Sequence, residues 1–117
     1  FEYEVIPGIS SVQALAAQHR IALNRIGEPI LITTGRQLAL EPEQTPENVV
    51  VMLDAHCTFE KFLNRGLHIY WGAYLGTPDE ILISGPLDEV CEQIKEVRAQ
   101  ARRQKGWIMD TYLLRKP

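Results

Sequence analysis

The segment from Val5 to Ser11 carries the residues best suited to hold a ligand. It reads Val-Ile-Pro-Gly-Ile-Ser-Ser, so an extended stretch meets a Pro-Gly break just before two hydroxyl side chains. Ser10 or Ser11 can cap a following helix, whose free amides can bind a polar group, while Gly8 allows close approach of the backbone. An ordinary capped helix has the same pattern. The residues alone therefore leave both a ligand site and a structural cap open.

The histidines are the natural candidates for a metal site. His19, His56 and His68 are widely spaced, and none belongs to a His-x-x-x-His pair. The sequence therefore predicts no metal site.

Two further groups of residues could support acid-base or covalent chemistry. His56 lies beside Cys57 and near Asp54, but adjacent residues on an extended strand point to opposite faces, so we do not expect a nucleophile and base here. Asp79, Glu80 and Asp110 are expected to be solvated carboxylates of turns and strand ends. The sequence identifies no catalytic residue.

Composition indicates one ordinary globular domain over residues 1–117. The chain is 45% hydrophobic and 23% charged, with a formal net charge of -3, which argues against nucleic-acid binding. A basic cluster is expected to complement the negative pole of a helix; it consists of Arg98, Arg102, Arg103 and Lys105. Cys57 and Cys91 match no zinc or redox spacing, and we expect a reducing cytoplasm. No signal segment or apolar run of ~18 residues indicates a membrane protein.

Hydrophobic patterns predict the elements that would position these residues. A helix following Ser10 or Ser11 would present one face, formed by Val12, Leu15, Ala16 and His19. Strands are predicted within residues 29–35, 49–53, 67–75, 80–84 and 107–114. The first should be buried, the second central and buried on both faces, and the third and fourth an antiparallel hairpin. Residues 36–48 are expected to form a polar loop.

Two more helices complete the prediction. Thr58 would cap a short helix that buries Phe59, Phe62 and Leu63 and stops at Gly66. Asp88 would cap the longest helix, which ends at Gly106; its buried face is Val90, Cys91, Ile94, Val97 and Ala101. The fold class is therefore α/β, with about five strands in a mixed parallel and antiparallel sheet flanked by about three helices.

The Pro7-Gly8-Ile9-Ser10-Ser11 turn resembles a motif of the tetrapyrrole methylases, in which Pro-Gly precedes small and hydroxyl residues. The resemblance implies a cleft between two α/β domains that holds S-adenosylmethionine. It also implies that Ser10 and Ser11 contact this cofactor.

A second family motif, an apolar strand ending in Tyr-Met-Gly, resembles Met52-Leu53-Asp54. In this register Leu53 would pack against the cofactor and Asp54 would replace the glycine. The alternative is that Met52 and Leu53 are ordinary core residues.

A third motif, Ala-Ser-x-Pro-Asp-Glu before a Gly-Thr-Leu element, resembles residues 75–80 and 84–87. By this resemblance the backbone around Leu75 and Gly76 would bind the adenine edge. The alternative is a plain hairpin turn.

Residues 70–77 and 106–112 are most similar to the family members that methylate precorrin-5 with loss of acetate. The resemblance implies that this chain is the C-terminal domain, without the N-terminal domain that supplies the rest of the cleft, and that the complete enzyme is a homodimer. Because the chain opens at Phe1 without an initiator Met, we expect a fragment. Because only one wall of the cleft would remain, we expect it to have negligible activity and weak cofactor binding. The alternatives are another member of the family and a non-catalytic α/β interaction domain.

Overall fold

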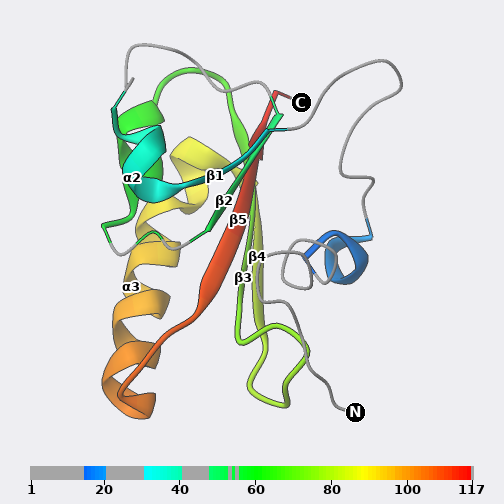
Figure 1. The fold of residues 1–117 in the computed structure, drawn as a ribbon, viewed down its shortest axis with the longest axis vertical. Helices are drawn as coiled ribbons and strands as arrows, with labels where there is room; N and C mark the ends of the chain where they lie inside the picture. The colour runs from blue at the N-terminus through cyan, green and yellow to red at the C-terminus, as the bar shows by residue number, and fades with distance from the viewer. Residues whose placement is uncertain (1–14, 21–30, 41–47, 53, 55, 117) are drawn as a thin grey trace.

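The computed structural model describes residues 15–20, 31–40, 48–52, 54 and 56–116. Residues 15–19 are helical. The other elements, in chain order, are β1 (Leu31–Thr34), α2 (Gly35–Leu38), β2 (Asn48–Met52), η1 (Thr58–Phe62), β3 (His68–Ala73), β4 (Ile81–Pro86), α3 (Leu87–Lys105) and β5 (Asp110–Arg115) (Figure 1).

The five strands form one sheet in the order β1-β2-β5-β3-β4. β1 pairs with β2 in parallel, whereas β5 runs antiparallel to both β2 and β3. β3 and β4 form the antiparallel hairpin expected from the short turn between them. The predicted mixed α/β sheet is confirmed.

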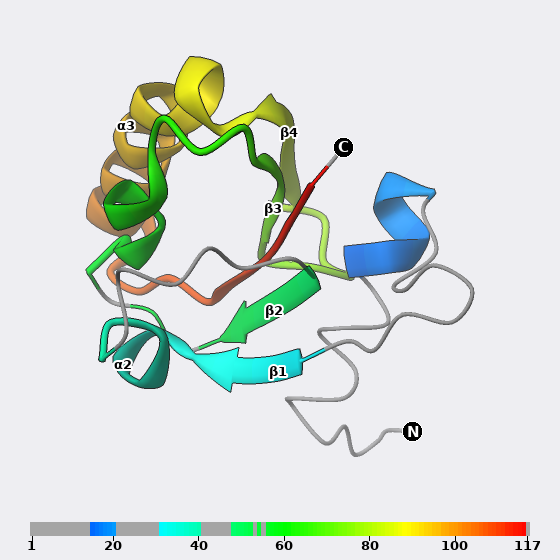
Figure 2. The same ribbon diagram turned by 90° about the horizontal axis from the view of Figure 1, so that it is seen from above.

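Helices cover the two faces of the sheet (Figures 1 and 2). α3 and η1 lie on one face, where they pack on a core that includes Val49, Val51 and Trp71. On the other face, Leu15 packs against Val50 and Leu113. β2 is therefore buried on both faces, as its apolar run predicts, although β5 rather than β2 is the middle strand.

The predicted burial of residues 29–35 is wrong for the part that the structure describes. Leu31 is 58% exposed and Ile32 is 49% exposed. β1 is an edge strand, and α3 packs on β3 and β4 at the other end of the sheet. The loop predicted from residue 36 also begins later, because Gly35–Leu38 form α2, and the Thr34 hydroxyl accepts a hydrogen bond from the Gln37 amide (3.2 Å).

Both predicted caps are also wrong. Thr58 is the first residue of η1, and its amide donates to the Asp54 carboxylate. Asp88 lies inside α3, which Pro86 precedes, and its carboxylate accepts from the Asn64 amide (2.8 Å). The Thr58 hydroxyl donates to Asp54, four residues earlier, and the Asp88 carboxylate accepts from the backbone of Asn64, 24 residues earlier, so neither polar group caps the helix that local pattern assigns to it.

The ends of the later elements agree better with the pattern. Gly106 terminates α3 in the left-handed region (φ 81°), and its amide donates to the Arg102 carbonyl. Gly66 is also left-handed, but η1 has already ended at Phe62. β5 begins at Asp110 rather than at residue 107, and Trp107 is 52% exposed. Among the described helices, none is both long and apolar enough to cross a membrane.

Candidate functional site

The carboxyl ends of three strands meet at one edge of the sheet. β1 and β2 are parallel, and β2 and β3 are both antiparallel to β5, so β1, β2 and β3 point the same way. In open α/β sheets, ligands bind outside the carboxyl ends of such strands. This edge is therefore the candidate site.

Three residues form a row across this edge, which we call the edge row: Met52, Thr111 and Gly72. Thr111 is in register with Met52 on one side and with Gly72 on the other. Because side chains alternate along a strand, the edge row shares the face of Val50 and Leu113 and is opposite to α3.

At the β3 end of the edge row, Gly72 has no side chain, and neighbouring leucines occupy the space above it. A Cβ at Gly72 would lie 2.7 Å from Leu75 Cδ2 and 3.1 Å from Leu15 Cδ1. Leu75 therefore packs over the glycine, and it joins Met52 in the cluster around Leu15. The edge thus presents the half-buried apolar side chains of Met52 and Leu75.

Leu75 and Gly76 begin the turn between β3 and β4. Gly76 has a left-handed backbone (φ 79°), and its amide donates to Glu80 Oε1 (2.9 Å). The Thr77 hydroxyl donates to the Tyr74 carbonyl (2.6 Å). The segment is thus a hairpin turn, and a ligand that uses the Gly76 amide must first displace the Glu80 carboxylate.

The other predicted cofactor contacts, Ser10, Ser11 and Leu53, lie outside the described residues. Residues near each of them do come together, since Leu15 follows the serines, Met52 precedes Leu53, and both pack in the same cluster. The structure therefore brings Leu15, Met52 and Leu75, each within or close in sequence to one of the three motifs, to one face of the sheet.

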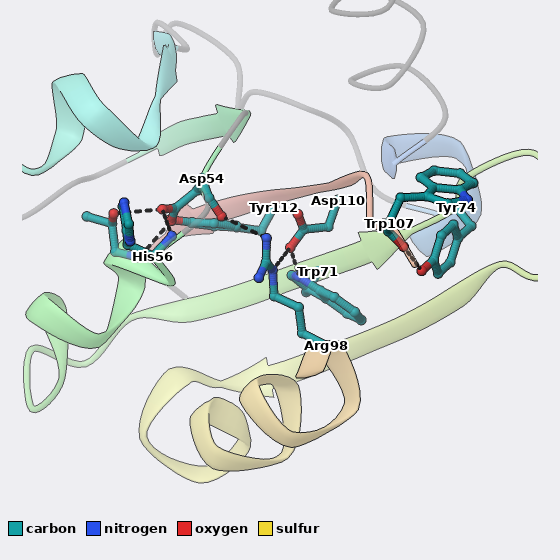
Figure 3. A network of polar contacts seen from close by, with 9 residues as sticks. Asp54, His56, Trp71, Tyr74, Arg98, Trp107, Asp110 and Tyr112 are labelled. Carbon is teal, nitrogen blue, oxygen red and sulfur yellow. Dashed lines mark hydrogen bonds and ion pairs between the residues drawn. The ribbon is translucent and has the colours of Figure 1, made fainter. Parts of the chain in front are cut away.

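A polar network that local sequence patterns do not reveal lies on the opposite face, around Asp54 (Figure 3). Asp54 is 5% exposed and accepts hydrogen bonds from the Tyr112 hydroxyl (2.5 Å), the Thr58 amide (2.7 Å) and hydroxyl (2.8 Å), and the His56 amide (3.2 Å). Burial, and then the nearby Asp54 charge, raise the pKa of Tyr112 well above its ordinary value. The phenol therefore stays protonated and donates to the carboxylate.

Asp110 and Arg98 extend this network to α3. Asp110 accepts from Arg98 Nε (3.0 Å) and from Trp71 Nε1 (2.8 Å), while Arg98 Nη2 donates to the Asp54 carbonyl (3.2 Å). Burial lowers the pKa of Arg98, but the Asp110 carboxylate outweighs this effect and raises it. The solvated Asp110 expected from the sequence is wrong, as is the dipole role of Arg98, because both side chains are buried as an ion pair.

Cys57 and the groove beside it offer no obvious chemistry. Burial is the main reason that the pKa of the Cys57 thiol rises to about 11, so the thiol is protonated at neutral pH. A groove of about 580 Å³ lies between η1 and α3; two of the four cations that line it, Lys95 and Arg98, are paired with Glu60 and Asp110, and the other two are Arg102 and Arg103. Within the part of the chain that the structure describes, no three potential metal ligands cluster.

The chain is similar to known proteins over the segments described above. Residues 1–91 match the family model described as Tetrapyrrole (Corrin/Porphyrin) Methylases. Over 116 residues, which are 99% of this chain, the sequence is 55% identical to a precorrin-6A synthase [deacetylating] from Sinorhizobium sp., of which it covers 44%. The crystal structure of a cobalamin synthesis related protein (CobF) from Corynebacterium diphtheriae superposes with a TM-score of 0.84 at 45% identity, over 91% of this chain and 44% of that one. The chain spans less than half the length of both relatives.

Proposed function

Because the chain belongs to the tetrapyrrole (corrin/porphyrin) methylase family, we propose that it forms the C-terminal, cofactor-binding part of a precorrin-6A synthase (deacetylating). The observation that carries this proposal is the 55% identity to an enzyme of that name over nearly the whole chain. The proposed reaction transfers a methyl group from S-adenosylmethionine to a ring carbon of precorrin-5, which leaves S-adenosylhomocysteine, and one molecule of water cleaves off the ring's acetyl group as acetic acid.

The proposed cofactor is S-adenosylmethionine, which supplies a methyl group already activated on a sulfonium. We assign its contacts in this chain to Ser10, Ser11, Leu53, Leu75 and Gly76. The described residues fit such a ligand, because Met52 and Leu75 give this edge half-buried apolar side chains, and a Cβ at Gly76 would meet nothing within 4 Å. The work of these residues is to orient the cofactor and exclude water from it, which is where a positioned site gains most of its rate.

The chain by itself provides one wall of the proposed cleft. It covers 44% of each relative, and we assign the opposite wall to an N-terminal domain. Calorimetry with S-adenosylhomocysteine should show only weak binding to the 117-residue chain, and tight binding would contradict the one-wall assignment. The family resemblance also leads us to propose a homodimer, which sedimentation of the longer protein tests.

The deciding experiment incubates the longer protein that carries this chain with precorrin-5 and S-adenosylmethionine. Methylation accompanied by acetate release is expected. Methylation of another tetrapyrrole without acetate release would place the protein elsewhere in the family, and failure to bind S-adenosylhomocysteine would favour a non-catalytic domain.

A pair of variants tests the cofactor wall directly. Leu75→Ala removes apolar contact from a half-buried side chain, so affinity for S-adenosylhomocysteine should fall by about 1 kcal/mol, roughly fivefold. Leu40→Ala makes the same chemical change at a side chain that is 68% exposed and should leave affinity unchanged. Equal affinities for the two variants would remove Leu75 from the wall.

A further inference from the structure

We propose that Asp54 is a positioning residue for the cofactor wall, acting from behind the sheet rather than by touching the cofactor. The inference rests on the proposed function. Asp54 stands just after the end of β2, and its side chain points into the network on the α3 side (Figure 3). The edge row lies on the other side of the sheet.

The Asp54 carboxylate joins the end of β2 to two other elements. Its Oδ2 accepts from the Tyr112 hydroxyl on the central strand β5 and from the Thr58 amide at the start of η1. Its Oδ1 accepts from the Thr58 hydroxyl and the His56 amide. A buried carboxylate with these donors is held firmly, since losing any one of them leaves a buried polar group unsatisfied.

The end of β1 packs directly on the same carboxylate. A Cβ at Gly35 would lie 2.5 Å from Asp54 Cγ and Oδ1, so the backbone of Gly35 and the carboxyl group are in close contact. The Thr58 hydroxyl also lies 3.4 Å from the Gly35 carbonyl. One side chain thus abuts the carboxyl ends of both parallel strands.

The backbone of Asp54 is fixed independently of its side chain. Arg98 donates to the Asp54 carbonyl, and Asp110 holds the same guanidinium at 3.0 Å. On the other side of position 53, Met52 is in register with Thr111. The chain that flanks the predicted cofactor contact at residue 53 is therefore tied to the sheet before that residue and to α3 after it.

A purely structural role is the competing explanation. Buried ionised networks are often no more stabilising than well-packed apolar residues, so stability alone is a weak reason to place a carboxylate here. What the carboxylate provides is directional contact to several backbone groups at the edge where the ligand is proposed to bind, which is how a supporting shell fixes a site.

The test compares Asp54→Asn with core variants of similar stability in the longer protein. An amide can still accept at its oxygen, but its NH2 group faces donors and cannot accept from them. The dissociation constant for S-adenosylhomocysteine, measured well below the unfolding temperature, should rise by about tenfold. The controls are Ile94→Val and Ile94→Ala, at a fully buried position of α3, chosen so that their losses of melting temperature lie on either side of the loss in Asp54→Asn. Both controls should leave the dissociation constant for S-adenosylhomocysteine unchanged.

Tyr112→Phe provides a gentler perturbation if Asp54→Asn does not fold. It removes one donor to the carboxylate, so the dissociation constant should rise by a smaller factor than in Asp54→Asn, while the Ile94 variants again show no change. If the wild-type protein binds and the Asp54 and Tyr112 variants bind equally well, the positioning role is refuted and the proposed function stands. If the wild-type protein does not bind S-adenosylhomocysteine, the proposed function is refuted together with this assignment.

Discussion

A methyl group added at Gly35 should test the close packing of β1 against Asp54. The added Cβ would lie 2.5 Å from Asp54 Cγ and 2.6 Å from Asp54 Cβ, distances that require atoms to move. Overpacking costs about 1–3 kcal/mol, and displacing the carboxylate would also weaken hydrogen bonds worth about 1–2 kcal/mol each. We expect Gly35→Ala to lower the free energy of unfolding by ~3 kcal/mol, although alanine is the better helix former by ~1 kcal/mol and Gly35 has no positive φ.

The cause of this loss can be isolated with second substitutions at Asp54, followed by urea unfolding. Asp54→Gly removes the three atoms nearest to the new methyl group, so in that background Gly35→Ala should cost less than ~0.5 kcal/mol. Asp54→Ala keeps the Cβ and should therefore retain much of the penalty. If Gly35→Ala alone does not fold, recovery of a cooperative transition in the Gly35→Ala/Asp54→Gly pair, and not in the Gly35→Ala/Asp54→Ala pair, is the expected result. Additive costs, or equal relief by the two Asp54 variants, would refute the close-packing explanation.

Two titratable side chains give further predictions. With a pKa of about 11 in place of 9.0, the Cys57 thiol should be about 100-fold less ionised to thiolate at pH 8. Alkylation of native Cys57 by iodoacetamide should therefore be slower than in the urea-unfolded chain by a similar factor. The measurement uses the Cys91→Ala variant, so that Cys57 is the thiol that reacts. Rapid labelling of native Cys57 would contradict the burial that raises its pKa. Burial lowers the pKa of His19 below 6.5 despite its hydrogen bond to the Trp71 carbonyl, so the unfolded state binds more protons and stability should fall as pH drops below about 6.5. His19→Gln should lose this part of the pH dependence, and an unchanged acid slope in that variant would exclude His19 as its source.

The strands of the sheet could be predicted from the sequence wherever the hydrophobic pattern reflects burial. Val49, Val50 and Val51 form an unbroken apolar run because β2 is covered on both faces. β1 has a similar composition yet leaves Leu31 and Ile32 exposed, since its place at the edge depends on strand order rather than on its own residues. Strand type is therefore encoded locally, whereas the position of a strand in the sheet is not.

Only part of the candidate site could be predicted from the sequence, for a related reason. The turn at Leu75 and Gly76 has a local signal, and the structure confirms the turn. The burial of Asp54 and Asp110 has no local signal in the sequence, because their partners Tyr112 and Arg98 lie on other elements, β5 and α3. A tyrosine in a predicted strand or an arginine in a predicted helix does not indicate which carboxylate of another element it contacts.

The place of β5 in the sheet has a consequence for how the protein is made. Among the five described strands, β5 is synthesised after the other four, yet it is the strand that joins β1-β2 to β3-β4. Until residues 110–115 leave the ribosome, the nascent chain holds two separate strand pairs, each with a bare edge where β5 belongs. Tyr112 and Asp110 arrive with this strand, so the polar network around Asp54 also closes only after β5 has been made. Until then the nascent protein exposes apolar strand surface, and it is in this interval that a chaperone would have most to protect.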